Sequence, residues 1–239
     1  MAGSYTEAEI AATIDHAVLK PDFTRADVDR ELDIAAEWGV WSACVRPSDV
    51  AYAVRRLDGS GVRVCTVIGF PHGTTSTAAK VAELRRAHDD GATEFDMVIH
   101  IGALRSGEDA IVRDDIAAVV DAAGGLISKV ILETSYLDDE QIARGSRLTE
   151  AGGATFVKTS TGFAGGGATV EHVRLMRESV SPAVQVKASG GVRGLDAAVA
   201  MLDAGATRLG TSATATILGE LRARLSGGDA TASEDTTSY

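Results

Sequence analysis

Two lysines of the chain lie inside apolar, strand-like segments, where a charged side chain is unusual. Lys158 stands in ATFVKTSTGF and Lys187 in AVQVKASGGV. Lysine is almost never fully buried without a partner. If the two strands are neighbours, the like charge and the removal from water both disfavour the charged form of each ammonium group. We therefore expect one of the two lysines to be neutral, and a neutral lysine is a nucleophile toward carbonyl carbon.

A third charge inside such a segment is Asp96, in EFDMVI. Because side chains alternate along a strand, an inward Lys158 is accompanied by an inward Phe156, while Val157 faces the covering helices. With one lysine neutral, an inward Asp96 balances the remaining ammonium, and the trio supplies an acid and a base. The alternative for a single strand lysine is a side chain that snorkels to solvent at the strand end. Two lysines at matched strand ends favour a functional pair.

Glycine-rich turns follow both lysines and the last predicted strand: TSTGFAGGGAT, ASGGVRG and LGTSATAT. Turns of this kind can present backbone N–H groups to an anion near helix N-termini. Glycines are also common as plain turn and cap residues, which is the structural alternative. We expect Arg193 to add positive charge near a phosphate group. The phosphate contacts themselves are expected from five residues: Gly162, Gly190, Gly191, Gly210 and Ser212.

Helix, glycine and strand follow one another repeatedly along the chain. The tripeptide GAT precedes the strand-like segments EFDMVI, FVKTS and RLGTS, and EWGV precedes WSACV as a looser copy. Glycine just past a helix supplies the left-handed residue that ends it. The segment LDAAVAMLDAG carries Leu195, Ala198, Val199 and Leu202 on one helical face. Eight strands, each followed by a helical pattern, are expected to start near Thr13, Trp41, Arg63, Glu94, Lys129, Thr155, Val184 and Thr207.

Eight such units predict an α/β protein with a single-domain (β/α)8 TIM barrel, in which strand ends converge on one mouth. We place the barrel at residues 1–225, with the first dozen residues forming a short N-terminal helix that caps the barrel floor. The polar segment 226–239 is predicted to be a flexible tail. A doubly wound open sheet is the alternative fold.

The composition excludes several classes of protein. The 239 residues are 45% hydrophobic and 5% aromatic, which suits buried parallel strands covered by Ala-rich helices. The net charge of −11 argues against a nucleic-acid partner. No apolar run reaches about 18 residues and the first residues do not resemble a signal peptide, so we expect a cytoplasmic protein without membrane contact. The two cysteines and the absence of HExxH or CxxC motifs predict no metal or other cofactor.

Other polar residues are weaker candidates for the site. Asp15 and His16 could point into the barrel mouth, although a histidine near a strand end is more often a hydrogen-bonded structural residue. Cys44 lies near the site if it faces inward, but a small buried hydrophobe is expected because no base is identifiable nearby. Lys80, three residues before a glutamate on a helical pattern, is predicted to lie on a solvated face. Glu133 closes the fifth strand at the rim, without an assigned role.

Across nearly its whole length the sequence resembles the deoxyribose-phosphate aldolase family. The matching stretches are long, dispersed and in order, and are therefore more specific than any single glycine motif. They read IDHAVLKPDFT, CVRPSDV, TVIGFPHGTTS, GATEFDMVIHIGALRSGE, KVILETSYL, FVKTSTGFAGGGATVEHVRLM, VKASGGVR and AGATRLGTS.

The resemblance implies a metal-independent cytosolic lyase of deoxyribonucleotide catabolism, a class I aldolase. Such an enzyme reversibly cleaves 2-deoxy-D-ribose 5-phosphate into D-glyceraldehyde 3-phosphate and acetaldehyde. It implies that Lys158 is the Schiff-base nucleophile, that Lys187 handles protons and disfavours protonation of its neighbour, and that Asp96 is the general acid and base. Phosphorylated sugars and aldehydes are then the partners, and the protein is expected to be a homo-oligomer, a dimer or a tetramer.

Several positions depart from the wording usual in this family. Ala17 replaces a threonine, Arg46 and His100 replace asparagines, and Ala213 replaces a serine that offers a phosphate hydroxyl. Some members carry lysine where this chain has Phe163, so we expect Phe163 to offer phosphate its backbone N–H. These departures affect phosphate affinity and rim contacts and leave the imine chemistry intact.

The C-terminal Tyr239 resembles the terminal tyrosine that enters the site in some members to aid proton transfer, and an inert chain end is the alternative. Two other functions are compatible with the same barrel. A phosphosugar isomerase would use Asp96 as a proton-abstracting base and the lysines as electrostatic clamps. A non-catalytic sensor would bind sugar phosphate without turning it over.

Overall fold

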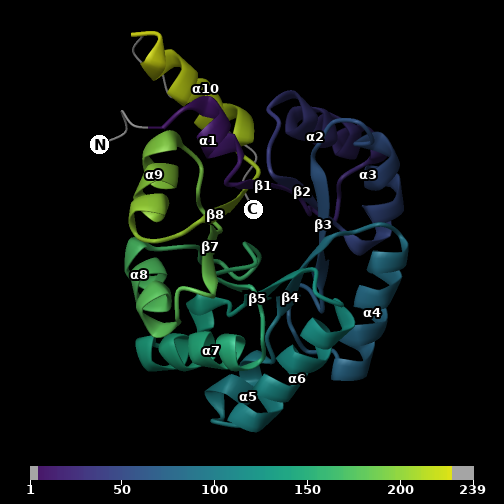
Figure 1. The fold of residues 1–239 in the computed structure, drawn as a ribbon, viewed down its shortest axis with the longest axis vertical. Coiled ribbons are helices and arrows are strands. Elements are labelled where there is room, and N and C mark those ends of the chain that lie inside the picture. Colours follow the sequence, from purple (N-terminus) through teal and green to yellow (C-terminus); the bar gives the residue numbers. More distant parts are fainter. Residues whose placement is uncertain (1–4, 228–239) are drawn as a thin grey trace.

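The computed structural model describes residues 5–227, which form a closed barrel of eight parallel strands (Figure 1). The strands pair in chain order, and β1 also pairs with β8, which closes the barrel and excludes the open sheet. The strands are β1 (Ile14–Val18), β2 (Ser42–Val45), β3 (Arg63–Ile68), β4 (Glu94–Val98), β5 (Ile127–Ile131), β6 (Phe156–Lys158), β7 (Gln185–Ser189) and β8 (Arg208–Thr211). Each begins within two residues of the position predicted from the sequence, so the predicted TIM barrel is confirmed.

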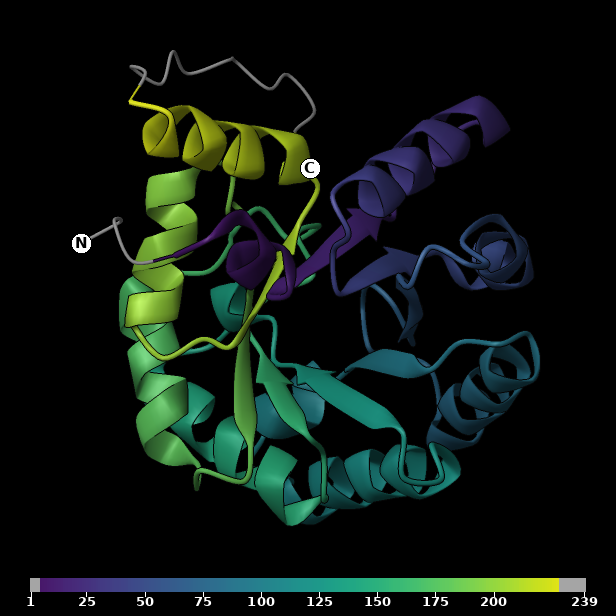
Figure 2. The ribbon, with the colours of Figure 1, turned by 45° about the horizontal axis from the view of Figure 1, so that its top comes forward.

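Helices surround the strands as an outer layer, as Figure 2 shows from a second direction. Those that follow the strands in turn are α2 (Arg25–Glu37), α3 (Val50–Arg56), α4 (Thr77–Asp89), α6 (Asp109–Ala122), α7 (Asp139–Ala151), α8 (Val170–Ser179), α9 (Leu195–Asp203) and α10 (Thr214–Leu225). Three short elements, α5 (Ile101–Arg105) and the 3₁₀ turns η1 (Pro47–Asp49) and η2 (Thr134–Tyr136), lie in loops after strands. No helix of residues 5–227 is long and apolar enough to cross a membrane.

Local sequence explains where the helices start and stop. Thr24 and Asp27 form a reciprocal capping box at the start of α2, satisfying N–H groups that the helix itself leaves unpaired. Glycines of the recurring GAT tripeptide follow helix ends. Gly91 and Gly205 adopt φ of 103° and 109°, a conformation that an L side chain rarely takes. At Gly205 a Cβ would also lie 2.8 Å from Cγ of Arg177. These glycines therefore let the chain turn back sharply into the next strand.

The strand alternation divides apolar from polar side chains. Val130, Val157 and Leu209 belong to the large apolar cluster between strands and helices. Phe156 lies outside that cluster and has Lys129 Nζ 6.0 Å from its ring centre. The barrel interior therefore holds charged groups, while the helix-facing layer supplies most of the hydrophobic stabilisation.

The N-terminal helix α1 (Glu7–Ala11) buries Ile10 and Ala11 and contacts α10. The Ala11 carbonyl accepts a hydrogen bond from the N–H of Trp41, just before β2, so α1 lies at the end of the barrel where strands begin. The last helix ends at Leu225. The predicted tail lies outside the described residues from position 228 onward, as does Tyr239.

Lys80 does not lie on a solvated face, so that prediction is wrong. Its side chain is fully buried, with Nζ 2.6 Å from Asp115 Oδ2 and 2.9 Å from the carbonyl oxygen of Val98. Glu83, three residues later, accepts a hydrogen bond from the N–H of Gly69. The pair therefore ties α4 to α6 and to the strand ends, an arrangement that spacing along one helix cannot reveal.

Candidate active site

The structure brings Lys158, Lys187 and Asp96 together inside the barrel. Lys158 and Lys187 are register partners on β6 and β7. Both ammonium groups donate to the same carboxylate oxygen, Oδ2 of Asp96 on β4, at 2.7 and 2.8 Å. All three side chains are almost completely buried. Two amines and a carboxylate thus share one small, buried space.

A second set of charged residues, which the sequence reasoning mostly missed, surrounds this trio. Lys129 on β5 contacts Oε2 of Glu94 at 2.5 Å and Oδ1 of Asp96 at 2.9 Å. Arg208 on β8 contacts Oε2 of Glu94 at 3.2 Å and Oδ1 of Asp15 at 2.8 Å. Asp15 also accepts a hydrogen bond from Lys187, which connects it to the trio. The network takes its side chains from β1 and from β4 to β8.

Charges in this buried network do not balance when every group is ionised. Its four basic side chains are Lys129, Lys158, Lys187 and Arg208, and its three acidic ones are Asp15, Glu94 and Asp96. One positive charge is in excess. Loss of one proton from a lysine would bring the network to neutrality, which the cost of burying an unbalanced charge favours.

The electrostatics identify groups that keep their charge. Burial disfavours the charged form of Lys187, but the carboxylates of Asp15 and Asp96 outweigh it and raise the pKa of Lys187 above its usual value. The pKa of Lys129 is likewise raised against burial, chiefly by Asp96. Burial opposes ionisation of Asp96, but Lys129, Lys158 and Lys187 hold its pKa well below the usual range. These three groups therefore stay charged near neutral pH.

Lys158 has the fewest ionic partners of the three lysines. Within residues 5–227, its ammonium is paired with Asp96 alone, on an oxygen that Lys187 also contacts. Lys187 contacts two carboxylates, and Lys129 contacts Glu94 and Asp96 and lies 3.7 Å from Asp15. Within the described chain, Lys158 therefore differs from the other two lysines in having a single carboxylate partner.

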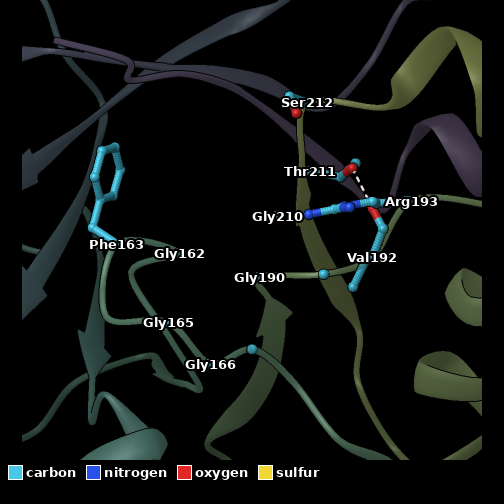
Figure 3. Close-up of a pocket in the computed structure, with 12 residues that line it drawn as sticks. Gly162, Phe163, Gly165, Gly166, Gly190, Val192, Arg193, Gly210, Thr211 and Ser212 are labelled. Atoms are coloured by element: carbon cyan, nitrogen blue, oxygen red, sulfur yellow. Dashed lines mark hydrogen bonds between the residues drawn. The ribbon is translucent and has the colours of Figure 1, made fainter. Parts of the chain in front are cut away.

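An open pocket of about 460 Å³ is lined by residues of the loops after β6 and β7 and of the end of β8 (Figure 3). Its lining includes every residue that the sequence analysis assigned to phosphate, namely Gly162, Gly190, Gly191, Arg193, Gly210 and Ser212. Gly162 and Phe163 lie on one side of the pocket, and Gly210 and Ser212 lie on the other (Figure 3). A smaller, deeper recess lined by Lys158 and Lys187 shares Gly162, Gly190 and Gly210 with it. An anion in the outer pocket would therefore sit next to the lysine pair.

Two of these glycines leave no room for a side chain. A Cβ on Gly210 would lie 2.7 Å from Cβ of Ser189 and 3.2 Å from Cε of Lys187. Gly190 has φ of 84°, and a Cβ there would lie 2.9 Å from the Cα of Gly167 in the loop after β6. The bare backbone lets the loops after β6, β7 and β8 approach one another and the lysines.

Phe163 does not offer its backbone N–H to the pocket, contrary to the sequence prediction. That N–H donates to Oγ1 of Thr161 at 3.0 Å. The Phe163 ring, 37% exposed, packs edge-on against Phe70 with ring centres 5.3 Å apart. Phe163 thus shapes one wall of the pocket with its ring, because its amide is used within the turn.

The other departures from the family wording fall into two groups. Ala17 lines the deep recess, and Ala213 is buried beside the pocket with its N–H bonded to Oγ1 of Thr211 at 2.9 Å. Arg46 and His100 have structural contacts. The guanidinium of Arg46 donates to three carbonyl groups of the loop after β1, and Nδ1 of His100 accepts the N–H of Ala103 at the start of α5.

Cys44 faces the deep recess and is 2% exposed, packed with Cys65 and Leu19. A hydrogen bond from the Cys65 thiol lowers the pKa of Cys44, while burial raises that of Cys65 well above its usual value. The two sulfur atoms and an oxygen of Asp96 lie within 4.8 Å of one another. They fit a cation poorly, because the Asp96 carboxylate already contacts three ammonium groups.

His16 is a structural residue. It lies inside β1 and is fully buried, with Nδ1 2.8 Å from Oγ1 of Thr214 and Nε2 3.1 Å from Oε2 of Glu31. Both partners belong to surrounding helices, so the imidazole faces away from the barrel interior. Its hydrogen bonds tie β1 to α2 and α10.

Comparison with known proteins agrees with this geometry. The chain is 54% identical over 208 residues to "Deoxyribose-phosphate aldolase" of Staphylococcus haemolyticus, covering 87% of this chain and 94% of that protein. It is 54% identical over 213 residues to "Deoxyribose-phosphate aldolase 2" of Staphylococcus aureus strain MRSA252, covering 89% and 97%. A tetrameric deoxyribose phosphate aldolase structure from Aeropyrum pernix superposes with a TM-score of 0.85 at 31% identity, covering 92% and 93%. Since the sequence model of the DeoC/LacD family aldolases matches residues 10–218, the chain belongs to that family.

Proposed function

We propose that the protein is a deoxyribose-phosphate aldolase that reversibly cleaves 2-deoxy-D-ribose 5-phosphate into D-glyceraldehyde 3-phosphate and acetaldehyde. The observation that carries the proposal is that Lys158 and Lys187 share one oxygen of Asp96 directly beneath a glycine-lined pocket. The names of the relatives from Staphylococcus support the same substrate.

In this proposal Lys158 is the nucleophile. Its neutral amine attacks the aldehyde carbon of the open-chain sugar phosphate, and loss of water from the adduct gives a protonated imine. The positive charge on nitrogen makes that imine an electron sink. Asp96 lies 2.7 Å from Nζ of Lys158, so its negative charge stabilises the cation as it forms.

Asp96 and Lys187 manage the protons during carbon–carbon cleavage. The Asp96 carboxylate, assisted by the Lys187 ammonium, relays the proton away from the C3 hydroxyl, and the C2–C3 bond breaks. The bonding electrons move to the imine nitrogen, which leaves an enamine on Lys158 and releases D-glyceraldehyde 3-phosphate. Protonation of the enamine carbon and hydrolysis of the resulting imine then release acetaldehyde and restore the lysine.

The phosphate group is the binding handle. We assign it to the outer pocket, with Gly162, Gly190, Gly191, Gly210 and Ser212 as contacts and Arg193 as a source of positive charge. The phosphate is remote from the bond that breaks, so binding there holds the sugar without contacting the reacting atoms and orients its aldehyde toward Lys158. A sugar without the phosphate should therefore lose turnover as well as apparent affinity.

The proposal also covers the oligomeric state, the partners, the cellular location and the cofactor requirement of the enzyme. The Aeropyrum pernix relative is tetrameric by its description, which supports a homo-oligomer, a dimer or a tetramer, for this chain. A net charge of −11 supports action on small molecules without nucleic acid. Phosphorylated sugars do not cross membranes unaided, which supports work in the cytoplasm. The chemistry assigned to Lys158 requires no metal or other cofactor.

Product analysis tests the reaction. Purified protein is incubated with 2-deoxy-D-ribose 5-phosphate, with and without EDTA, and both aldehydes are quantified by derivatisation and mass spectrometry. We expect equimolar acetaldehyde and D-glyceraldehyde 3-phosphate at the same rate in both samples. An isomeric sugar phosphate as the sole product, or no product, would reject the proposal, and full loss of activity in EDTA would indicate a metal-dependent aldolase.

A further inference from the structure

Glu133, two residues after β5 and just before η2, has an unusual backbone. Its φ is 51° and its ψ is 67°, and among residues 5–227 no other residue apart from glycine has a positive φ. This left-handed conformation is unfavourable for a residue with a long side chain and persists only where the surroundings enforce it. The neighbouring amides provide that enforcement, because Leu132 donates to the Lys158 carbonyl at 3.0 Å and Thr134 donates to the Thr159 carbonyl at 3.1 Å.

The strained backbone directs a buried carboxylate at the pocket turn. The Glu133 side chain is 1% exposed, and its Oε2 accepts hydrogen bonds from both the N–H (3.2 Å) and the hydroxyl of Thr161. The hydroxyl oxygen of Thr161 in turn accepts the N–H of Phe163. One carboxylate therefore fixes the turn from Thr161 to Phe163, and Gly162 in its middle lines both the outer pocket and the deep recess.

Charge alone would argue against a carboxylate at this place. A buried negative charge close to an anion pocket repels phosphate, and no basic side chain of the described residues forms an ion pair with Glu133. Hydrogen bonds from Thr161 and Ser135 satisfy the carboxylate instead. The geometry that it imposes on the turn must therefore outweigh the repulsion.

We propose that Glu133 is a positioning residue that holds the Thr161–Phe163 turn in the shape that binds the substrate phosphate. The proposal rests on the function proposed above. Glu133 has two separable effects: its left-handed backbone directs the side chain toward the turn, and its carboxylate orders the turn. Glycine tolerates the same backbone without strain but lacks the carboxylate, and glutamine keeps the side-chain shape and an oxygen acceptor.

Three variants test the proposal. In Glu133→Gly we expect KM for 2-deoxy-D-ribose 5-phosphate to rise about tenfold, while kcat/KM for unphosphorylated 2-deoxyribose changes less than twofold. Glu133→Gln should restore KM to within about threefold of the wild type. Ser135→Ala, which removes only the remaining hydrogen bond to Glu133, is the matched control and should change neither parameter more than twofold. Inhibition by inorganic phosphate should weaken in parallel with the rise in KM.

The outcomes separate this proposal from the proposed function. If the wild type cleaves the sugar phosphate and folded Glu133→Gly keeps the wild-type KM, the positioning role is wrong. An equal loss on both sugars would also reject it, because that pattern indicates general disruption. If Glu133→Gly does not fold, Thr161→Val removes the hydroxyl that donates to Glu133 and accepts the Phe163 N–H, and of the donors in the turn it leaves only the backbone N–H of residue 161 on the carboxylate. It should therefore give a selective rise in KM in the same direction. Absence of cleavage by the wild type would instead reject the proposed function.

Discussion

Lys158 and Lys187 occupy facing positions on β6 and β7, and both ammonium groups contact Oδ2 of Asp96. Their environments differ in one respect. Lys187 has a second carboxylate partner in Asp15, whereas Lys158 shares Asp96 with two other lysines. This difference supports the proposal that Lys187 is the permanent cation and Lys158 the nucleophile.

Replacing Lys158 by methionine should abolish catalysis without destabilising the fold. We expect kcat to fall by roughly a thousandfold or more, since no other amine is placed to form the imine. A neutral Lys158 contributes no charge to the network, so a similarly sized apolar side chain should change the free energy of unfolding by less than about 1.5 kcal/mol. Urea denaturation measures this, and a loss of about 3–5 kcal/mol, expected when one partner of a buried ion pair is removed, would contradict a neutral Lys158.

Replacing Lys187 by methionine should change the pH dependence of the reaction. The network then carries one positive charge fewer, so Lys158 keeps its proton to balance the carboxylates. We expect kcat/KM for cleavage to fall roughly a hundredfold at pH 7 and to recover in part toward pH 10. A profile measured between pH 6 and pH 10 gives the answer. A variant profile parallel to that of the wild type would show that Lys187 does not control the charge of Lys158.

Stability should decrease in acid because of the buried carboxylates. Burial alone would raise the pKa values of Asp15 and Asp96, but the lysines, joined at Asp15 by Arg208, hold both below the usual value. A depressed pKa contributes stability that is complete above the unfolded-state value, about 3.9, and is lost as pH falls through the folded-state value. We expect the free energy of unfolding to be level from pH 5 to pH 8 and to drop below pH 4. Asp96→Asn should make the free energy of unfolding fall less steeply below pH 4. An equally steep fall in the variant would show that Asp96 is not the source of the acid sensitivity.

The absence of a side chain at Gly210 leaves space beside the lysines, and adding one methyl group there tests whether that space is needed. Gly210→Ala places a Cβ 2.7 Å from Ser189 and 3.2 Å from Lys187 Cε, so we expect kcat/KM to fall at least tenfold. Gly219→Ala is the matched control. Gly219 lies within α10 with nothing within 4 Å of an added Cβ, and alanine there should raise stability by about 0.5–1 kcal/mol without changing activity. Equal activity of Gly210→Ala and Gly219→Ala would show that catalysis does not depend on the bare backbone at Gly210.

Much of this site could be predicted from the sequence because it follows from local pattern. Glycines after helices and short apolar segments locate the strands, and Lys158, Lys187 and Asp96 are conspicuous as charges inside them. Once the barrel closes, matched strand ends must converge. The glycine-rich turns after β6, β7 and β8 likewise predict one shared pocket.

The remainder depends on contacts between distant segments. Lys129 and Arg208 lie near the beginnings of their predicted strands, where a charge usually reaches solvent, and only the closed barrel shows that Glu94 and Asp15 neutralise them. Their signal is the same one that identified Lys158, a charge on the inward face of a strand. The buried Lys80–Asp115 pair joins two helices, and helical spacing cannot indicate it.

Trapping the imine is the most direct test of Lys158 as nucleophile. The protein is incubated with acetaldehyde at pH 7, reduced with sodium borohydride, digested, and mapped by tandem mass spectrometry. We expect one ethyl group on Lys158, loss of activity in proportion to the modification, and unmodified Lys187 and Lys129. An unmodified Lys158 in inactivated protein, or modification of Lys187 in its place, would contradict the account.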